Sequence, residues 1–241
     1  KAIGDNHPSA RVTGGLQVFG GRLYVPMASF EEAMAMDPNY DCCVFRGSVL
    51  AYDSKTGRLL WKRYTIGQKP TEVSRDPHGK PMWGPSGAAV WSAVTIDPEA
   101  GQFYVGTGDN YSNPPTDTSD GILAFDLESG KPSWVYQALA GDAWTVGCMV
   151  EPKINCPENE GPDSDMGASP ILVKRVDGRK IIIGAQKNGV AHAVDPKENG
   201  KVLWTKKLAK GGIQGGLQWG QATDGENLYA SKADTLWSSD S

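Results

Sequence analysis

The sequence predicts an all-β fold made of repeated antiparallel sheets, and three observations support this. One phrase occurs three times, as Gly47–Asp53, Gly121–Asp126 and Gly189–Asp195, and each copy is followed by a glycine and then a tryptophan. Glycine (30 residues) and proline (16 residues) are frequent, as expected for many short strands and turns. No segment shows sustained helical periodicity.

Each copy of the phrase predicts a strand, a turn and a second strand. Alternation of small or apolar residues with others is typical of a half-buried strand. The aspartate that ends the strand can accept backbone N–H bonds in the turn, and the glycine supplies the positive φ that closes it. The tryptophan is large enough to dock one sheet on the next. The residues are Asp53, Gly57 and Trp61; Asp126, Gly130 and Trp134; and Asp195, Gly200 and Trp204.

A further strand is predicted before each phrase, and another near the end of the chain. These strands cover Gly21–Pro26, Gln102–Gly106, Lys180–Gly184 and Asn227–Ala230. We therefore expect four sheet units, which begin near Thr13, Trp91, Asp165 and Gly215, the last one cut short.

Radially arranged four-stranded sheets are the blades of a β-propeller, which closes with about 4–8 blades. The chain would cover about three and a half such blades and would not close the ring. It begins at Lys1 rather than Met and ends without finishing a blade, so we expect a fragment of a longer protein.

Charge and hydropathy exclude two classes of partner. The net charge is −4 and both signs are dispersed, so no basic stripe is present for a nucleic acid. No apolar run reaches about 18 residues, so we expect no membrane span.

Four cysteines form two close pairs, Cys42 with Cys43 and Cys148 with Cys156. They are either thiol pairs or a vicinal disulfide and a loop-closing disulfide. The spacing does not match zinc ligands, and the three histidines are scattered. The sequence favours the disulfides, which would imply an oxidising compartment.

Three further segments, together with the blade phrase and the Cys42-Cys43 pair, resemble the pyrroloquinoline quinone (PQQ)-dependent alcohol dehydrogenases, and most of all their polyvinyl-alcohol dehydrogenase-like branch. The segments are Gly84–Trp91, Tyr104–Tyr111 and Gly161–Asp165. The resemblance runs from about Thr13 to Trp219. The blade phrase alone is less specific, because outer-membrane assembly lipoproteins share it without binding a quinone.

The resemblance implies that residues 1–241 form part of an eight-bladed propeller domain of the quinoprotein alcohol dehydrogenase type. PQQ and Ca²⁺ would lie on its axis and oxidise an alcohol, secondary or polymeric such as polyvinyl alcohol. Electrons would pass to a cytochrome c. The chain has no Cys-x-x-Cys-His motif, so haem c would lie on a missing segment or a partner. The implied location is the bacterial periplasm or outside the cell.

The resemblance also implies a cofactor and metal site. Trp91 matches the tryptophan that stacks on the quinone, although packing between blades is the alternative. Glu31, Asp109 and Asp165 would hold the Ca²⁺, which needs hard oxygen ligands, and Glu32 is the alternative to Glu31. Lys187 matches the cation that stabilises the reduced quinone, although a turn lysine facing water is the alternative.

A carboxylate next to the metal should take the proton of the alcohol. In simpler family members this base directly follows a tryptophan, but here Thr145 occupies that place and cannot act as the base. Asp165-Met166-Gly167-Ala168 matches the segment of the base, so we prefer Asp165. Asp142, just before Trp144, is the second candidate.

Other contacts to the quinone follow from the resemblance. Thr13 matches a hydroxyl contact, and Ser29 is expected to contribute. Cys42 and Cys43 would form a disulfide over the quinone face opposite Trp91. Arg46 follows the pair and would meet a quinone carboxylate.

Two other interpretations remain open from the sequence. The propeller could be a cell-envelope binding or assembly scaffold without a cofactor, in which case the loops at the axis should lack a coherent ligand set. Alternatively, the parent is an enzyme but these 241 residues alone are inactive, because an open propeller exposes sheet edges and offers only part of the quinone site.

Overall fold

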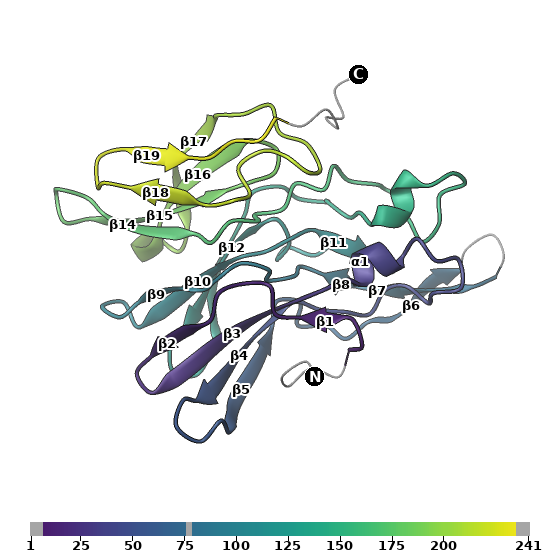
Figure 1. Ribbon diagram of the computed structural model, residues 1–241, viewed down its shortest axis with the longest axis horizontal. Helices are drawn as coiled ribbons and strands as arrows, with labels where there is room; N and C mark the ends of the chain where they lie inside the picture. Colours follow the sequence, from purple (N-terminus) through teal and green to yellow (C-terminus); the bar gives the residue numbers. More distant parts are fainter. Residues whose placement is uncertain (1–6, 76–78, 235–241) are drawn as a thin grey trace.

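The computed structural model describes residues 7–75 and 79–234. Antiparallel sheets follow one another along the chain and spread like a fan (Figure 1). The first sheet contains β1 (Ala10–Arg11), β2 (Gln17–Phe19), β3 (Arg22–Ser29), β4 (Ser48–Asp53) and β5 (Leu59–Tyr64). The second contains β9 (Thr95–Asp97), β10 (Gln102–Gly106), β12 (Gly121–Asp126) and β13 (Pro132–Gln137). The third contains β14 (Ile171–Lys174), β15 (Lys180–Ala185), β16 (Val190–Asp195) and β17 (Lys201–Lys207).

A fourth unit consists of the hairpin β18 (Gln221–Thr223) and β19 (Leu228–Ala230), which starts near the predicted position. The order of strands in the second and third sheets follows the chain, as in propeller blades. The predicted β-propeller units, three of them complete and the fourth short, are therefore confirmed.

The turn chemistry of the repeat is as predicted. Asp53 accepts hydrogen bonds from the backbone N–H groups of Lys55 and Thr56, and the aspartates of the other two copies cap their turns in the same way. The turn glycines have φ values of 70°, 67° and 78°, in the left-handed region that glycine tolerates. They are Gly57, Gly130 and Gly200.

Two of the three repeat tryptophans, Trp61 and Trp134, dock one sheet on the next, whereas Trp204 of the third sheet is 38% exposed. Trp61 of β5 stacks on Phe103 of the second sheet, with 6.0 Å between ring centroids, and its indole N–H donates to the Glu128 carbonyl at 2.7 Å. Its ring covers Gly130, the turn glycine of the second sheet. Trp134 covers Gly200 of the third sheet in the same manner. The turn glycines of the second and third sheets, Gly130 and Gly200, thus also make room for the tryptophan of the preceding sheet.

The contact between Gly130 and Trp61 predicts how substitution of the glycine will change stability. A Cβ at Gly130 would lie 2.8 Å from Trp61 Cε3, whereas a Cβ at Gly57 would meet no atom within 4 Å. Both residues have positive φ. We expect Gly130→Ala to lower the free energy of unfolding by about 2–3 kcal/mol, and Gly57→Ala by only about 1–2 kcal/mol of backbone strain. Urea unfolding of both variants measures the difference; equal losses would show that Trp61 does not need the space.

Apolar side chains fill the spaces between consecutive sheets. Tyr24, Val49 and Phe103 belong to a buried cluster between the first and second sheets, and Ile122 and Ile182 to one between the second and third. This packing is the physical basis of the stacked array, because an apolar sheet face must be covered by a neighbour, and the second sheet is covered on both faces.

Several short elements lie beyond one end of the sheets, on the right in Figure 1. They are helix α1 (Glu31–Met34), hairpin β6 (Thr71–Arg75) with β7 (Pro81–Gly84), and the pair β8 (Ser86–Gly87) and β11 (Asn110–Ser112). Two 3₁₀ turns occur at η1 (Val146–Met149) and η2 (Pro196–Glu198). The prediction of no extended helix is confirmed in the described residues, and none of their helices is long and apolar enough to cross a bilayer.

Of the two interpretations of the cysteines, the structure contains the disulfides. Cys42 is bonded to Cys43, and Cys148 to Cys156. The second bond closes a loop that packs against the residues after α1, where Asn155 Nδ2 donates to the carbonyls of Ala35 and Tyr40.

Candidate functional site

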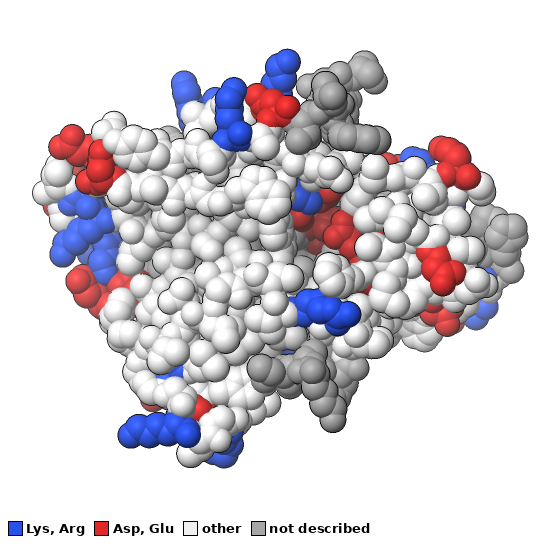
Figure 2. Space-filling model, viewed as in Figure 1, with Lys and Arg blue, Asp and Glu red and all other residues white. Residues whose placement is uncertain are grey.

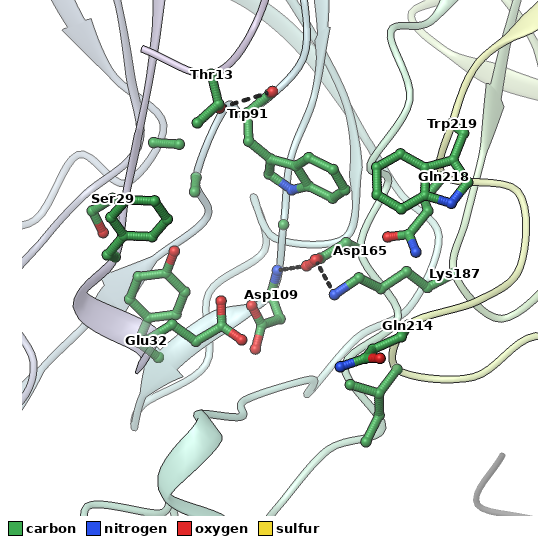
Figure 3. Close-up of a pocket in the computed structure, with 16 residues that line it drawn as sticks. Thr13, Ser29, Glu32, Trp91, Asp109, Asp165, Lys187, Gln214, Gln218 and Trp219 are labelled. Carbon is green, nitrogen blue, oxygen red and sulfur yellow. Dashed lines mark hydrogen bonds and ion pairs between the residues drawn. The ribbon is translucent and has the colours of Figure 1, made fainter. Parts of the chain in front are cut away.

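A cavity of about 550 Å³ opens near α1, where loops of successive sheet units converge. Figure 2 shows acidic side chains on the floor of a hollow in this region. Every unit contributes to the lining, which includes Thr13, Ser29, Glu32, Trp91, Asp109, Tyr111, Asp165, Lys187, Gln214, Gln218 and Trp219 (Figure 3). Six residues that the sequence singled out for chemistry therefore meet in one place: Thr13, Ser29, Trp91, Asp109, Asp165 and Lys187.

Three aspartates form an acidic cluster at the cavity, of which Asp109 and Asp165 line it. Asp109, Asp163 and Asp165 are all buried, and each offers a carboxylate oxygen within 4.8 Å of the others. One oxygen of Asp109 and one of Asp163 have no hydrogen-bond partner among the described residues. Buried carboxylate oxygens without a partner are costly, and hard cations bind such groups. The arrangement therefore fits a cation.

Lys187 lies among these carboxylates and does not face water. Its Nζ is 2.7 Å from Asp163 Oδ1 and 2.7 Å from Asp165 Oδ2, and the residue is only 9% exposed. Burial alone would lower the pKa of Lys187, but Asp165 and Asp163 hold it well above its usual value. Lys187 is therefore a buried ammonium, 5.9 Å from the ring centroid of Trp91.

Asp165 is held at both of its oxygens. Oδ1 accepts the backbone N–H of Asp109 at 2.7 Å, and Oδ2 pairs with Lys187. The other candidate base, Asp142, accepts the N–H groups of Asp163 and Ser164 at 3.2 and 2.7 Å and does not line the cavity. The structure therefore brings Asp165 to the cavity, and Asp142 supports the loop that carries it.

Trp91 lines the cavity and is supported by two neighbours. A Cβ on Gly167 would lie 2.3 Å from Trp91 Cζ2, so the glycine permits the ring to pack directly on the backbone. The Thr13 hydroxyl donates to the Trp91 carbonyl at 3.0 Å. Trp91 thus differs from the tryptophans that dock the sheets, because its indole borders open space.

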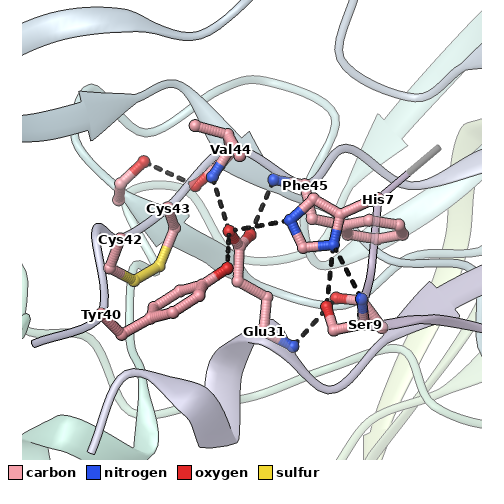
Figure 4. A network of polar contacts seen from close by, with 11 residues as sticks. His7, Ser9, Glu31, Tyr40, Cys42, Cys43, Val44 and Phe45 are labelled. Carbon is pink, nitrogen blue, oxygen red and sulfur yellow. Dashed lines mark hydrogen bonds and ion pairs between the residues drawn. A yellow bond between two sulfur atoms is a disulfide. The ribbon is translucent and has the colours of Figure 1, made fainter. Parts of the chain in front are cut away.

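The structure corrects the expectation for Glu31. Its carboxylate is fully buried and does not line the cavity. It accepts four hydrogen bonds: His7 Nε2, the Tyr40 hydroxyl and Val44 N–H reach Oε1, and Phe45 N–H reaches Oε2 (Figure 4). Glu32 lines the cavity instead, with its carboxylate turned toward Asp109 (Figure 3).

The expected contacts of Cys42, Cys43 and Arg46 also differ from the structure, because none of the three lines the cavity. The disulfide is buried in the apolar core beside the first sheet, and the N–H groups of the two residues that follow it donate to Glu31. The Nη1 of Arg46 donates to three backbone carbonyls between residues 66 and 68, and its guanidinium carbon lies 3.7 Å from the Tyr64 ring centroid.

Burial, and after it the crowding of the carboxyl groups, shifts their pKa values. Burial, together with the negative charges of Asp165 and Asp142, raises the pKa of Glu32 to about 7, against the opposing effect of Lys187. Burial and neighbouring carboxylates also raise the pKa of Asp109 well above its usual range. When ionised, these carboxyl groups repel one another. A bound cation would supply the positive charge that offsets this repulsion.

The sequence interpretation did not name several residues of the site. Asp163 stands two positions before Asp165, in a segment already singled out, and this acidic pair was the available signal. Tyr111 also ends a segment already singled out, whereas Gln218 and Trp219 carry no repeat position that marks them. They come to the cavity only because the loops between sheets converge there.

Comparisons with known proteins agree with this architecture. Residues 32–163 match the family described as the glucose/ethanol/alcohol dehydrogenase β-propeller domain with PQQ. A polyvinylalcohol dehydrogenase of Sphingopyxis sp. is 39% identical over 236 residues, which cover 97% of this chain and 36% of that protein. A lanthanide-dependent methanol dehydrogenase of Methylorubrum extorquens is 25% identical over 214 residues, or 78% of this chain and 33% of that protein.

The solved structure of a quinohemoprotein alcohol dehydrogenase from Comamonas testosteroni superposes with a TM-score of 0.54 at 23% identity. The superposition covers 93% of this chain and 31% of that one, and it shows a shared fold. The chain spans about a third of the length of the curated relatives that it matches.

Proposed function

Because the chain belongs to the β-propeller family of PQQ-dependent alcohol dehydrogenases, we propose that the protein oxidises an alcohol at the cavity around Trp91 and Asp165. The observation that carries the proposal is the convergence of a partly buried indole, a buried lysine and a group of carboxylates at one cavity. A scaffold without a cofactor would have no need for this costly arrangement of buried charge.

The residues present fit PQQ and a cation. In our proposal, the indole of Trp91 supports the planar quinone, and Thr13 and Ser29 border it. Glu32, Asp109 and Asp165 hold the cation through carboxylate oxygens. When bound with the cation, PQQ supplies the two-electron acceptor for the alcohol.

Asp165 is proposed as the base that takes the hydroxyl proton of the alcohol. The Asp109 N–H and the Lys187 ammonium donate to its two oxygens and hold the carboxylate in one orientation. A fixed orientation favours transfer because the base does not have to reorganise when the proton moves. Lys187 also contributes positive charge to the wall that Trp91 forms, where negative charge would develop.

We propose calcium as the cation, because carboxylate oxygens are its usual ligands. The same ligands suit other hard cations, and one relative is described as lanthanide-dependent. The proposed substrate is a secondary or polymeric alcohol, in line with the name of the polyvinylalcohol dehydrogenase relative. The proposed electron acceptor is a cytochrome c, and the proposed location is the bacterial periplasm or outside the cell, in line with the two disulfides.

Reconstitution of the intact protein tests the proposal. The apoprotein is prepared with a chelator, and dye-linked oxidation of polyvinyl alcohol and of a short secondary alcohol is measured after addition of PQQ, Ca²⁺ or both. We expect activity only when both are added. Absence of PQQ binding in a direct titration would contradict the proposal and favour the binding scaffold.

A further inference from the structure

We propose that Glu31 is a positioning residue whose buried carboxylate sets the rotation of α1, so that the adjacent Glu32 points into the cavity. This inference rests on the proposed function, in which Glu32 is a cation ligand. Glu31 thus binds groups in the protein interior, whereas its neighbour Glu32 lines the site.

The contacts of Glu31 form a complete anchor (Figure 4). Oε1 accepts from Val44 N–H at 2.8 Å, from the Tyr40 hydroxyl at 2.9 Å and from His7 Nε2 at 3.2 Å, and Oε2 accepts from Phe45 N–H at 2.7 Å. The Ser9 N–H and hydroxyl lie 3.3 and 2.8 Å from His7 Nδ1. An N–H that donates to Nδ1 leaves Nε2 as the donor to Glu31.

Helix α1 cannot set its own orientation. It contains four residues; within the described part of the chain, the side chain of its N-cap residue Phe30 makes no capping hydrogen bond, and its first N–H donates only to Ser29 Oγ, at 3.2 Å. A single turn is marginal in water, so the side chains that it buries decide how it sits. Consecutive residues on a helix point about 100° apart, since 3.6 residues make one turn. When the Glu31 side chain is fixed toward the interior, Glu32 is directed toward the cavity.

The second side of the segment is held independently. Asn155, from the loop closed by the Cys148–Cys156 disulfide, donates to the carbonyls of Ala35, Asp37 and Tyr40. These bonds fix the chain after α1 but leave the rotation of the turn to Glu31. The hydrogen bonds of Glu31 therefore connect His7, and the residues after the vicinal disulfide, to the helix that carries Glu32 at the wall of the cavity.

Terbium luminescence in the intact protein tests this, with Tb³⁺ as a hard-cation probe sensitised by nearby tryptophan. We expect Glu31→Gln to weaken Tb³⁺ binding about 10–100-fold, as for residues that orient a metal ligand. In a Glu32→Gln background, the same substitution should change the affinity less than about 2-fold, because the ligand that it orients is gone. Tyr40→Phe removes one of the four donors and should give a smaller loss in a protein that still folds.

Asp97→Asn is the matched control. Asp97 is also a fully buried carboxylate that accepts backbone N–H groups and pairs with Lys180 at 2.5 Å, but it does not line the cavity. Its substitution should lower the melting temperature without a change in Tb³⁺ affinity.

Three results would overturn the inference. Unchanged affinity in Glu31→Gln, while Glu32→Gln weakens binding, would overturn it and leave the proposed function standing. Equal losses with and without Glu32 would show a general structural role for Glu31. No effect of Glu32→Gln would overturn the ligand assignment itself, and the inference with it.

Discussion

Asp165→Asn is expected to lower kcat for alcohol oxidation by about 10²–10⁴-fold, which is the range of general acid–base catalysis. Asparagine has nearly the same shape and can still accept the Asp109 N–H, which Asp165 Oδ1 accepts at 2.7 Å. It cannot take a proton from the alcohol at neutral pH. Steady-state dye reduction by the intact protein, reconstituted with PQQ and Ca²⁺, measures the effect, and a PQQ titration checks that the cofactor still binds.

Asp142→Asn is the control for this prediction. Asp142 supports the same loop through the N–H groups of Asp163 and Ser164, but it lies outside the cavity. We expect it to affect stability more than kcat. Activity that survives Asp165→Asn and is lost in Asp142→Asn would assign the base to Asp142 and retain the family.

Lys187→Met is expected to destabilise the protein by about 3–5 kcal/mol, the range for removal of one partner of a buried ion pair. Asp163 and Asp165, each 2.7 Å from Nζ in the structure, would be left buried without a positive partner. Burial and Asp165 already raise the pKa of Asp163 well above its usual range. The loss should be largest at alkaline pH and shrink as pH falls, because protonated carboxyl groups need no counter-charge.

Urea unfolding of the cation-free protein at pH 5 and pH 8 measures this dependence. Lys201→Met is the comparison, because Lys201 pairs with Glu198 at 2.7 Å but on the exposed surface. Exposed pairs contribute little, so its effect should be small at both pH values. A pH-independent loss in Lys187→Met would mean that the side chain contributes packing and not charge.

Much of the fold could be predicted because each turn of the repeat is formed by residues that are close together in the chain. Asp126 binds the N–H of its own turn, and Gly130 adopts the φ that closes it, so three or four neighbouring residues determine the turn. The same glycine receives Trp61 from the previous sheet. Since each unit repeats this chemistry, recognition of the phrase also predicted how the sheets stack.

The candidate site could be predicted in part. Trp91, Asp109 and Asp165 stand in segments that carried the family resemblance, and Lys187 lies two positions before the third copy of the phrase; all four line the cavity. The expectations failed for Glu31, the cysteine pair and Arg46, none of which lines the cavity. Arg46 follows the cysteine pair as expected, but its guanidinium binds backbone carbonyls and Tyr64 outside the cavity.

The sequence by itself determined the strands, the turns, the stacking order and the family, because these depend on residues close together in the chain or on repeated spacing. Only the tertiary structure decided between Glu31 and Glu32. The two adjacent glutamates look alike in the sequence. In the structure, Glu31 accepts hydrogen bonds from four donors, which lie up to 24 positions away, and Glu32 lines the cavity. A buried carboxylate must be satisfied by whatever donors the fold brings to it, and that set exists only after the distant segments have met.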